Sequence, residues 1–162
     1  MLTIEIDDFL NHIYLEKKYS RHTLRAYKKD LYDFYYFVNK NSISKWKEVQ
    51  KKDIHEYLYF LSVKKFNAKS VSRKLACLKS LLNFLVRNNI LKNNVAKSIP
   101  SPKSDKKLPV FLSQDQISEL LKLDRADNVN ELRNNLILEI FYSTGVRISE
   151  LVRIKIKDLD LN

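Results

Sequence analysis

The 162-residue sequence contains a single glycine, Gly145, and this scarcity limits what the chain can fold into. Phosphate-binding loops and dinucleotide-binding fingerprints each need several glycines, so neither kind of site is expected. Tight β-hairpin turns need residues at positive φ, so an architecture rich in hairpins is also disfavoured. Hydrophobic residues nevertheless make up 44% of the chain, which is enough to build a core. The sequence therefore predicts a mainly α protein.

Cysteine and histidine are as informative as glycine. The one cysteine, Cys77, excludes an internal disulfide and a cysteine-based zinc site, and it fits a reducing cytoplasm. The three histidines are scattered along the chain, so we expect no metal site. No apolar run approaches the roughly 18 residues of a membrane span, and no signal-peptide pattern opens the chain. We expect a soluble, cytoplasmic protein with no membrane partner.

Charge is distributed unevenly along the chain. Residues 1–100 contain 20 basic and 9 acidic residues, a net charge of +11, whereas residues 101–162 contain 10 of each. This asymmetry indicates two units with different roles, and a basic unit with many aromatic residues suits a polyanion such as nucleic acid. The alternative is a solvated, lysine-rich surface without a polyanionic partner.

Apolar residues at helical spacing predict four helices in the basic half. The first is expected at about 4–16 and the second starts after the N-cap Ser20. The third follows a capping box of Asp53 and Glu56, and the fourth is expected at about 68–86, with a short helical turn near Val95. The residues expected to face the core are Ile6, Phe9, Leu10, Ile13, Leu24, Tyr27, Leu31, Phe34, Val38, Ile54, Tyr57, Leu58, Leu61, Val71, Leu75, Leu78, Leu82 and Leu85. The pattern predicts a bundle of four or five helices spanning residues 1–98.

All three prolines lie within residues 99–109, which predicts an extended linker. Beyond it, Ser113 and Gln116 form a capping-box pattern, and a helix at about 131–143 should end at Gly145 in the left-handed conformation. A shorter helix is expected at about 148–152, and the alternating segment 154–161 predicts a strand. The residues expected inside are Ile117, Leu120, Leu121, Leu132, Leu136, Ile140 and Phe141. Residues 110–162 thus resemble the beginning of a domain whose remainder is absent.

Two of the predicted helices carry cations in their N-terminal halves. Arg21, Arg25 and Lys28 recur at helical spacing away from the apolar stripe, and Lys69 and Arg73 are four residues apart. Such helices could enter a DNA major groove, where arginine pairs with guanine, and hydroxyls at a helix start could bind phosphate. The alternative is an ordinary polar helix face. The candidate DNA-binding residues are Ser20, Arg21, Thr23, Arg25, Lys28, Lys29, Lys69, Arg73 and Lys74.

A second candidate site follows Gly145. Arg147 stands at the start of a predicted short helix, and arginine is suited to bidentate contact with phosphate oxygens. Glu150, three residues later, is placed to support the guanidinium from behind. The alternative is a surface ion pair without function.

Several of these segments together resemble the tyrosine recombinases, and in particular their Xer-like members. The stretch Phe141-Tyr142-Ser143-Thr144-Gly145-Val146-Arg147-Ile148-Ser149-Glu150-Leu151 resembles the family's first catalytic-arginine box. Tyr19 to Tyr27 with Asp30-Leu31, and Ser70 to Leu75 with Phe84-Leu85, resemble its core-binding domain. The proline-containing join is similar as well, although Asn94-Val95 replaces the Asn-Pro of many members. The resemblance follows the family's order along essentially the whole chain.

The resemblance implies a site-specific DNA recombinase or integrase, in which a tyrosine attacks the scissile phosphate without metal or cofactor. It implies a SAM-like, helical core-binding domain at 1–98, a linker at 99–109 and the start of an α+β catalytic domain at 110–162. Arg147 matches the first catalytic arginine and Glu150 its acidic supporter. The implied partners are the duplex DNA of a recombination site and further protomers assembled as a tetramer, and the implied location is the nucleoid.

Other groups that the family uses are expected to follow Asn162: a lysine, a His-x-x-Arg box and the nucleophilic tyrosine. His22-Thr23-Leu24-Arg25 matches that box literally but lies in the wrong domain, and no tyrosine of this chain is expected to be the nucleophile. We therefore expect no strand cleavage by this chain alone. The alternatives are a stand-alone DNA-binding module that competes for recombination sites, and a helical domain whose basic face binds an acidic protein.

Overall fold

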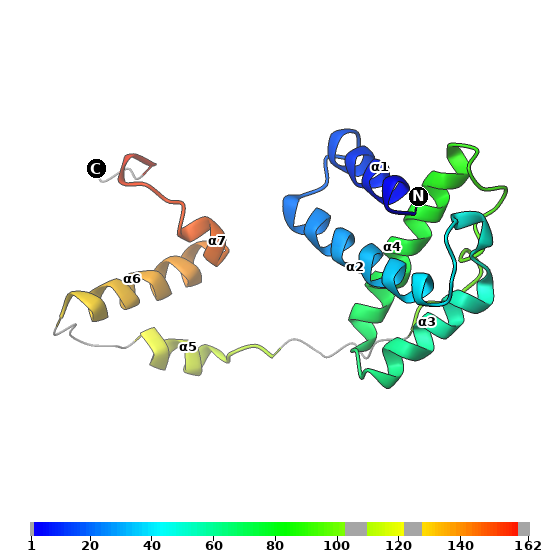
Figure 1. Ribbon diagram of the computed structural model, residues 1–162. Coiled ribbons are helices and arrows are strands. Elements are labelled where there is room, and N and C mark those ends of the chain that lie inside the picture. Colours follow the sequence, from blue (N-terminus) through cyan, green and yellow to red (C-terminus); the bar gives the residue numbers. More distant parts are fainter. Residues whose placement is uncertain (1, 103–109, 122–127, 159–162) are drawn as a thin grey trace. The chain divides into compact units, whose positions relative to one another are not determined.

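The computed structural model describes residues 2–102, 110–121 and 128–158. The chain forms two compact units, Met1–Lys106 and Lys107–Asn162, which are described separately below (Figure 1). In the described residues, no helix is both long and apolar enough to cross a membrane.

Four α-helices make up the first unit: α1 (Leu2–Leu15), α2 (Arg21–Lys40), α3 (Lys51–Val63) and α4 (Ala68–Arg87). A short 3-10 helix, η1 (Trp46–Glu48), precedes α3, and a turn at residues 95–98 follows α4. Helices α1, α2 and α4 pack against one another, and α3 packs against α2 (Figure 1). The predicted helical bundle is confirmed, with boundaries within two residues of those expected for the first and fourth helices.

The core lies between the apolar faces of these helices. Phe34 on α2 is 1% exposed and contacts both Trp46 and Tyr57, with ring centroids 6.2 and 5.0 Å apart. The Trp46 indole Nε1–H donates to the Leu2 carbonyl at 3.2 Å, so α1 and η1 are joined by a buried hydrogen bond. Most of the predicted core residues are buried; Leu10, Leu24, Tyr27 and Leu58 are only partly covered. Helical spacing predicted this core because its stripes are long and regular.

Side-chain caps fix where three of these helices start. Ser20 caps α2 by accepting the Thr23 N–H at 3.2 Å, as predicted. Asn67 caps α4 by accepting the Ser70 N–H at 2.7 Å. The predicted capping box of Asp53 and Glu56 is wrong: α3 begins earlier, at Lys51, and Asp53 instead accepts the Gln50 N–H at 2.7 Å. Asp53 therefore occupies the third helical position and not the N-cap.

The second unit has three α-helices among its described residues: α5 (Gln114–Leu121), α6 (Val129–Thr144) and α7 (Ile148–Leu151). Ser113 and Gln116 form the predicted reciprocal cap, with hydrogen bonds of 2.9 and 3.2 Å. Gly145 ends α6 at φ 63° and donates its N–H to the Phe141 carbonyl at 3.0 Å. Only glycine adopts this conformation without cost, and this explains the position of the one glycine in the chain.

Two expectations for this unit are wrong. None of its predicted core residues is buried; Leu132 and Leu136 are 62% and 55% exposed, because the helices present their apolar faces without a covering layer in the described residues. The predicted strand at 154–161 is also absent from its described part, where Ile156–Asp158 form the 3-10 helix η2. The Lys155 N–H donates to the Asp158 carboxylate at 3.1 Å, and this local bond favours a turn over an extended backbone. Residues 159–161 lie outside the described residues.

Candidate nucleic-acid interface and catalytic arginine

The start of α2 concentrates groups that suit an anion. The Ser20 and Thr23 hydroxyls lie 2.9 Å apart at the first turn, which contains no acidic residue. Arg21 and Arg25 follow on the same helix and are exposed. Unpaired N–H groups and the helix dipole make such an end attractive to phosphate, and the neighbouring guanidinium groups strengthen that attraction.

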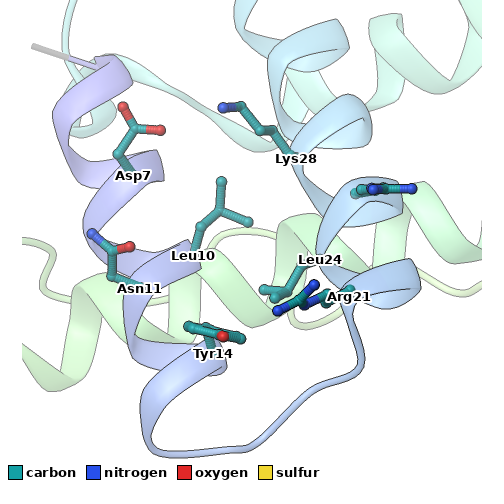
Figure 2. Close-up of a pocket in the computed structure, with 8 residues that line it drawn as sticks. Asp7, Leu10, Asn11, Tyr14, Arg21, Leu24 and Lys28 are labelled. Atoms are coloured by element: carbon teal, nitrogen blue, oxygen red, sulfur yellow. The ribbon is translucent and has the colours of Figure 1, made fainter.

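A groove between α1 and α2 places three of the predicted cations along one wall (Figure 2). Arg21, Arg25 and Lys28 line it from α2, and the groove's other polar residues, Asp7, Asn11 and Tyr14, line it from α1.

The groove is not uniformly basic. The Tyr32 hydroxyl donates to Asp7 at 3.1 Å, and the Lys28 ammonium lies 5.8 Å from the Tyr32 ring. Desolvation, followed by the bond to Asp7, raises the pKa of Tyr32 above its usual value, so this hydroxyl stays protonated and remains a donor. The Asp7 carboxylate makes the end beside Lys28 less attractive to a phosphate than the end beside Arg21.

Arg73 projects from α4 onto α2. Its Nη1 donates to the Asp30 carboxylate and lies 3.4 Å from the Ala26 carbonyl, while 43% of its side chain stays exposed. Lys29 and Lys69 are exposed as well, and neither forms an ion pair with another described residue. Seven of the candidate cations are therefore exposed. One of them, Arg147, belongs to the second unit, and the other six belong to the first: Arg21, Arg25, Lys28, Lys29, Lys69 and Arg73.

Lys74 does not belong with these surface residues. Its side chain is 3% exposed, and its Nζ lies 3.0 Å from Asp30 Oδ1 and 2.5 Å from Asp33 Oδ2. An ammonium held this way is not available to DNA, so the structure removes Lys74 from the candidate surface. Its spacing from Val71 and Leu78, both buried, is the sequence feature that marks position 74 as interior.

Arg147 lies between the end of α6 and the start of α7. Gly145 turns the chain, and the Thr144 hydroxyl accepts the Val146 N–H at 3.2 Å. Glu150 then accepts two bonds from Arg147, from its backbone N–H at 2.9 Å and from its Nη1 at 3.0 Å. These two bonds lower the pKa of Glu150 below its usual value, so the carboxylate remains charged at neutral pH.

The Arg147 side chain is 82% exposed, so the guanidinium combines a supporting carboxylate on one side with access for a ligand on the other. A guanidinium in this arrangement can bind phosphate oxygens through its remaining N–H groups. Among the described residues, no cluster of histidine, cysteine or acidic side chains could hold a metal ion.

Two family models account for this order of features, a capped helical unit with a basic surface and then an arginine behind a glycine turn. Residues 6–89 match the phage integrase N-terminal SAM-like domain, and residues 110–162 match the phage integrase family. The chain belongs to this family.

Its relatives include several tyrosine recombinases. XerC of Psychromonas ingrahamii is 37% identical over 97% of this chain and 52% of its own length, and XerC of Thermodesulfovibrio yellowstonii is 38% identical over 96% and 50%. XerD of Oceanobacillus iheyensis is 34% identical over 99% and 54%. The match to the crystal structure of XerA recombinase covers 99% of this chain and 52% of the XerA chain, with a TM-score of 0.50 and 25% sequence identity. The chain spans about half the length of these relatives.

Proposed function

We propose that this chain is the DNA-binding part of an Xer-like tyrosine recombinase, and that α2 and α4 contact the duplex of a recombination site. The observation that carries the proposal is the exposed set of cations at the capped N-terminal half of α2, with Arg73 beside it on α4. The family match supports the same function, since its relatives are named tyrosine recombinases.

The proposed contacts are of two kinds. The Ser20 and Thr23 hydroxyls and the flexible side chains of Lys28, Lys29 and Lys69 would bind backbone phosphates, which fixes the position of the helices but not the sequence. Arg21, Arg25 and Arg73 would provide the contacts to base edges, because a guanidinium can bond two acceptors of guanine at once. The major groove is wide enough to admit one helix.

Arg147 is proposed to bind the scissile phosphate, with Glu150 as its positioning residue. In phosphoryl transfer negative charge develops on the non-bridging oxygens, and donors that are already oriented stabilise it most. Glu150 would hold the guanidinium so that its other N–H groups face those oxygens. No step through a metal or cofactor is needed for this role.

The proposal extends to the whole recombinase. Residues 1–98 would form the core-binding domain, 99–109 the linker and 110–162 the start of the catalytic domain. Duplex DNA is the proposed partner, with further protomers as a tetramer on paired sites, and the proposed location is the nucleoid. The alternative is a DNA-binding module that occupies recombination sites without cleaving them.

A binding titration against a duplex library at two salt concentrations tests the proposal. Enrichment of one sequence of about ten base pairs that persists at the higher salt is expected for a core-binding domain. The logarithm of the binding constant should fall with the logarithm of salt concentration with a slope near −0.9 for each phosphate neutralised. Binding that is equal across sequences and disappears with salt would contradict the proposal.

Alanine variants test which arginines contact the DNA. Arg21→Ala, Arg25→Ala and Arg73→Ala should each weaken specific binding by about 1–3 kcal/mol where the arginine contacts a base. Arg147→Ala serves as a comparison in the other unit: it removes an exposed arginine that we expect to contribute to cleavage and little to the affinity. In a recombinase chain with a complete catalytic domain, the same Arg147→Ala change should abolish strand cleavage. Unchanged affinity in all three α2 and α4 variants would contradict the groove assignment.

A further inference from the structure

Two acidic residues of α2 meet two basic residues of α4 where these helices pack together. Asp30 is 2% exposed and pairs with both Arg73 and Lys74, while Asp33 pairs with Lys74, at 2.5 Å, but not with Arg73. Lys74 therefore bridges the two carboxylates, and Arg73 is attached to this network only through Asp30 among the described acidic residues.

Neutralising Lys74 does not require Asp30. The Asp33 carboxylate lies closer to the Lys74 ammonium than Asp30 does, and it is 40% exposed, so its own desolvation is modest. Burying a second carboxylate is costly unless that carboxylate is paired on every side. Asp30 has a cation beside each oxygen: the Lys74 ammonium lies 3.0 Å from Oδ1 as an ion pair without a hydrogen bond, and Arg73 donates a hydrogen bond to Oδ2.

The Arg73 contacts with Asp30 and Ala26 both use a single nitrogen, Nη1. A guanidinium has five N–H donors in a rigid plane, so fixing one edge also fixes where the other edge points. With 43% of its side chain exposed, Arg73 remains accessible to a ligand beside Ala26 of α2.

We propose that Asp30 is a positioning residue for DNA recognition: it holds Arg73 in the orientation in which its free edge meets the duplex. This inference rests on the proposed function. An arginine that is already ordered loses less conformational entropy on binding than a free one, so the contact contributes more to affinity. Lys74 is the buried counter-charge beside Asp30, with its Nζ 3.0 Å from Oδ1.

The sign of a charge change separates positioning from simple electrostatics. Removing a carboxylate near DNA reduces repulsion of the phosphates, so a purely electrostatic role predicts tighter binding by an Asp30→Asn variant. A positioning role predicts weaker binding, because the amide cannot hold the guanidinium as a carboxylate does.

The test compares Asp30→Asn with Asp33→Asn in the full chain, using the sequence selected from the duplex library as the probe. The two variants change the same charge on the same helix, but Asp33 does not contact Arg73. We expect Asp30→Asn to weaken specific binding by about two- to tenfold, which is the effect of ordering one long side chain. Asp33→Asn should bind as the wild type does or more tightly.

The dependence on Arg73 completes the test. In an Arg73→Ala background, Asp30→Asn should cause no further loss, because nothing remains to be positioned. Arg73→Lys should bind nearly as weakly as Arg73→Ala, since an ammonium has no second fixed edge. This last variant leaves the buried carboxylates in place, so it remains informative even where Asp30→Asn fails to fold.

The two proposals fail differently. Absence of sequence-specific binding by the wild-type chain would contradict the proposed function. Specific binding by the wild type combined with unchanged or tighter binding by a folded Asp30→Asn variant would overturn the positioning role alone. Wild-type affinity in Arg73→Lys would overturn it as well.

Discussion

Glu150 accepts both the backbone N–H of Arg147, at 2.9 Å, and its guanidinium Nη1, at 3.0 Å. One carboxylate thus caps the short helix α7 and orients the arginine that precedes it. Because the two functions use different oxygens of the same group, loss of its charge should disturb the backbone turn and the guanidinium together.

The first prediction concerns the titration of Glu150. The two bonds from Arg147 lower its pKa below the ordinary value of 4.5, so the carboxylate should titrate at more acidic pH when followed by carbon-13 NMR of the side-chain carboxyl. A lowered pKa means that the cap contributes fully above pH 4.5 and is lost as the pH falls through the lowered value. The amide resonances of Arg147 should shift over the same acidic range.

Glu150→Gln is the control for this titration, because the acidic shift of the Arg147 amide should then disappear. A Glu150 carboxyl that titrates at or above its ordinary value would contradict the observed cap.

The second prediction is that the Cys77 thiol is unreactive in the folded protein. Cys77 is 0% exposed, and its pKa is raised, first by burial and then by the nearby Asp30 carboxylate. Since the thiolate is the reactive form, a disulfide reagent such as Ellman's should label the native chain very slowly at pH 8 and label it stoichiometrically in guanidinium chloride. The sequence has one cysteine, so Cys77→Ala gives the blank. Rapid labelling of the native chain would show that α4 is not packed as described.

The third prediction concerns the buried ammonium. Lys74→Met should lower the free energy of unfolding by about 2 kcal/mol, because it removes a charged hydrogen bond to Asp33 and the ion pair with Asp30. The loss should stay below the roughly 3–5 kcal/mol of a fully orphaned buried charge, since Asp30 keeps Arg73 and Asp33 is partly exposed. Urea unfolding measures this difference.

Lys69→Met is the matched control for Lys74→Met: it lies on the same helix but is exposed, and should change stability by no more than about 0.5 kcal/mol. Equal effects of the two substitutions would argue against a buried ion-pair network.

How far the sequence predicts this structure depends on whether a pattern is local. The stripe of α2 and the cap at Ser20 involve residues within one or two turns of each other, so they could be predicted, as could the left-handed Gly145. The ion pairs of Lys74 could not be predicted, because its partners Asp30 and Asp33 lie about forty positions away in the sequence.

In the second unit the sequence predicted the helices but not their exposure. The apolar face of α6 was correctly placed on a helix, but Leu136 is exposed, because periodicity shows which face is apolar and not whether another element covers it. For the candidate site, the Arg147–Glu150 spacing already indicated their contact. The joining of Arg73 to Asp30 required the packing of two helices.

The final prediction is that the stability of the first unit comes from the α1–α2–α4 core and not from its exposed apolar residues. Leu82 on α4 is 0% exposed, whereas Leu15 on α1 is 71% exposed. Leu82→Ala should therefore cost about 2–5 kcal/mol, through lost burial and the cavity it leaves, and Leu15→Ala about 0.5 kcal/mol or less. Trp46, the one tryptophan in the sequence, is buried against Phe34, so its fluorescence reports unfolding of this unit in urea. Similar costs for the two leucines would mean that α4 does not pack into the core as the structure describes.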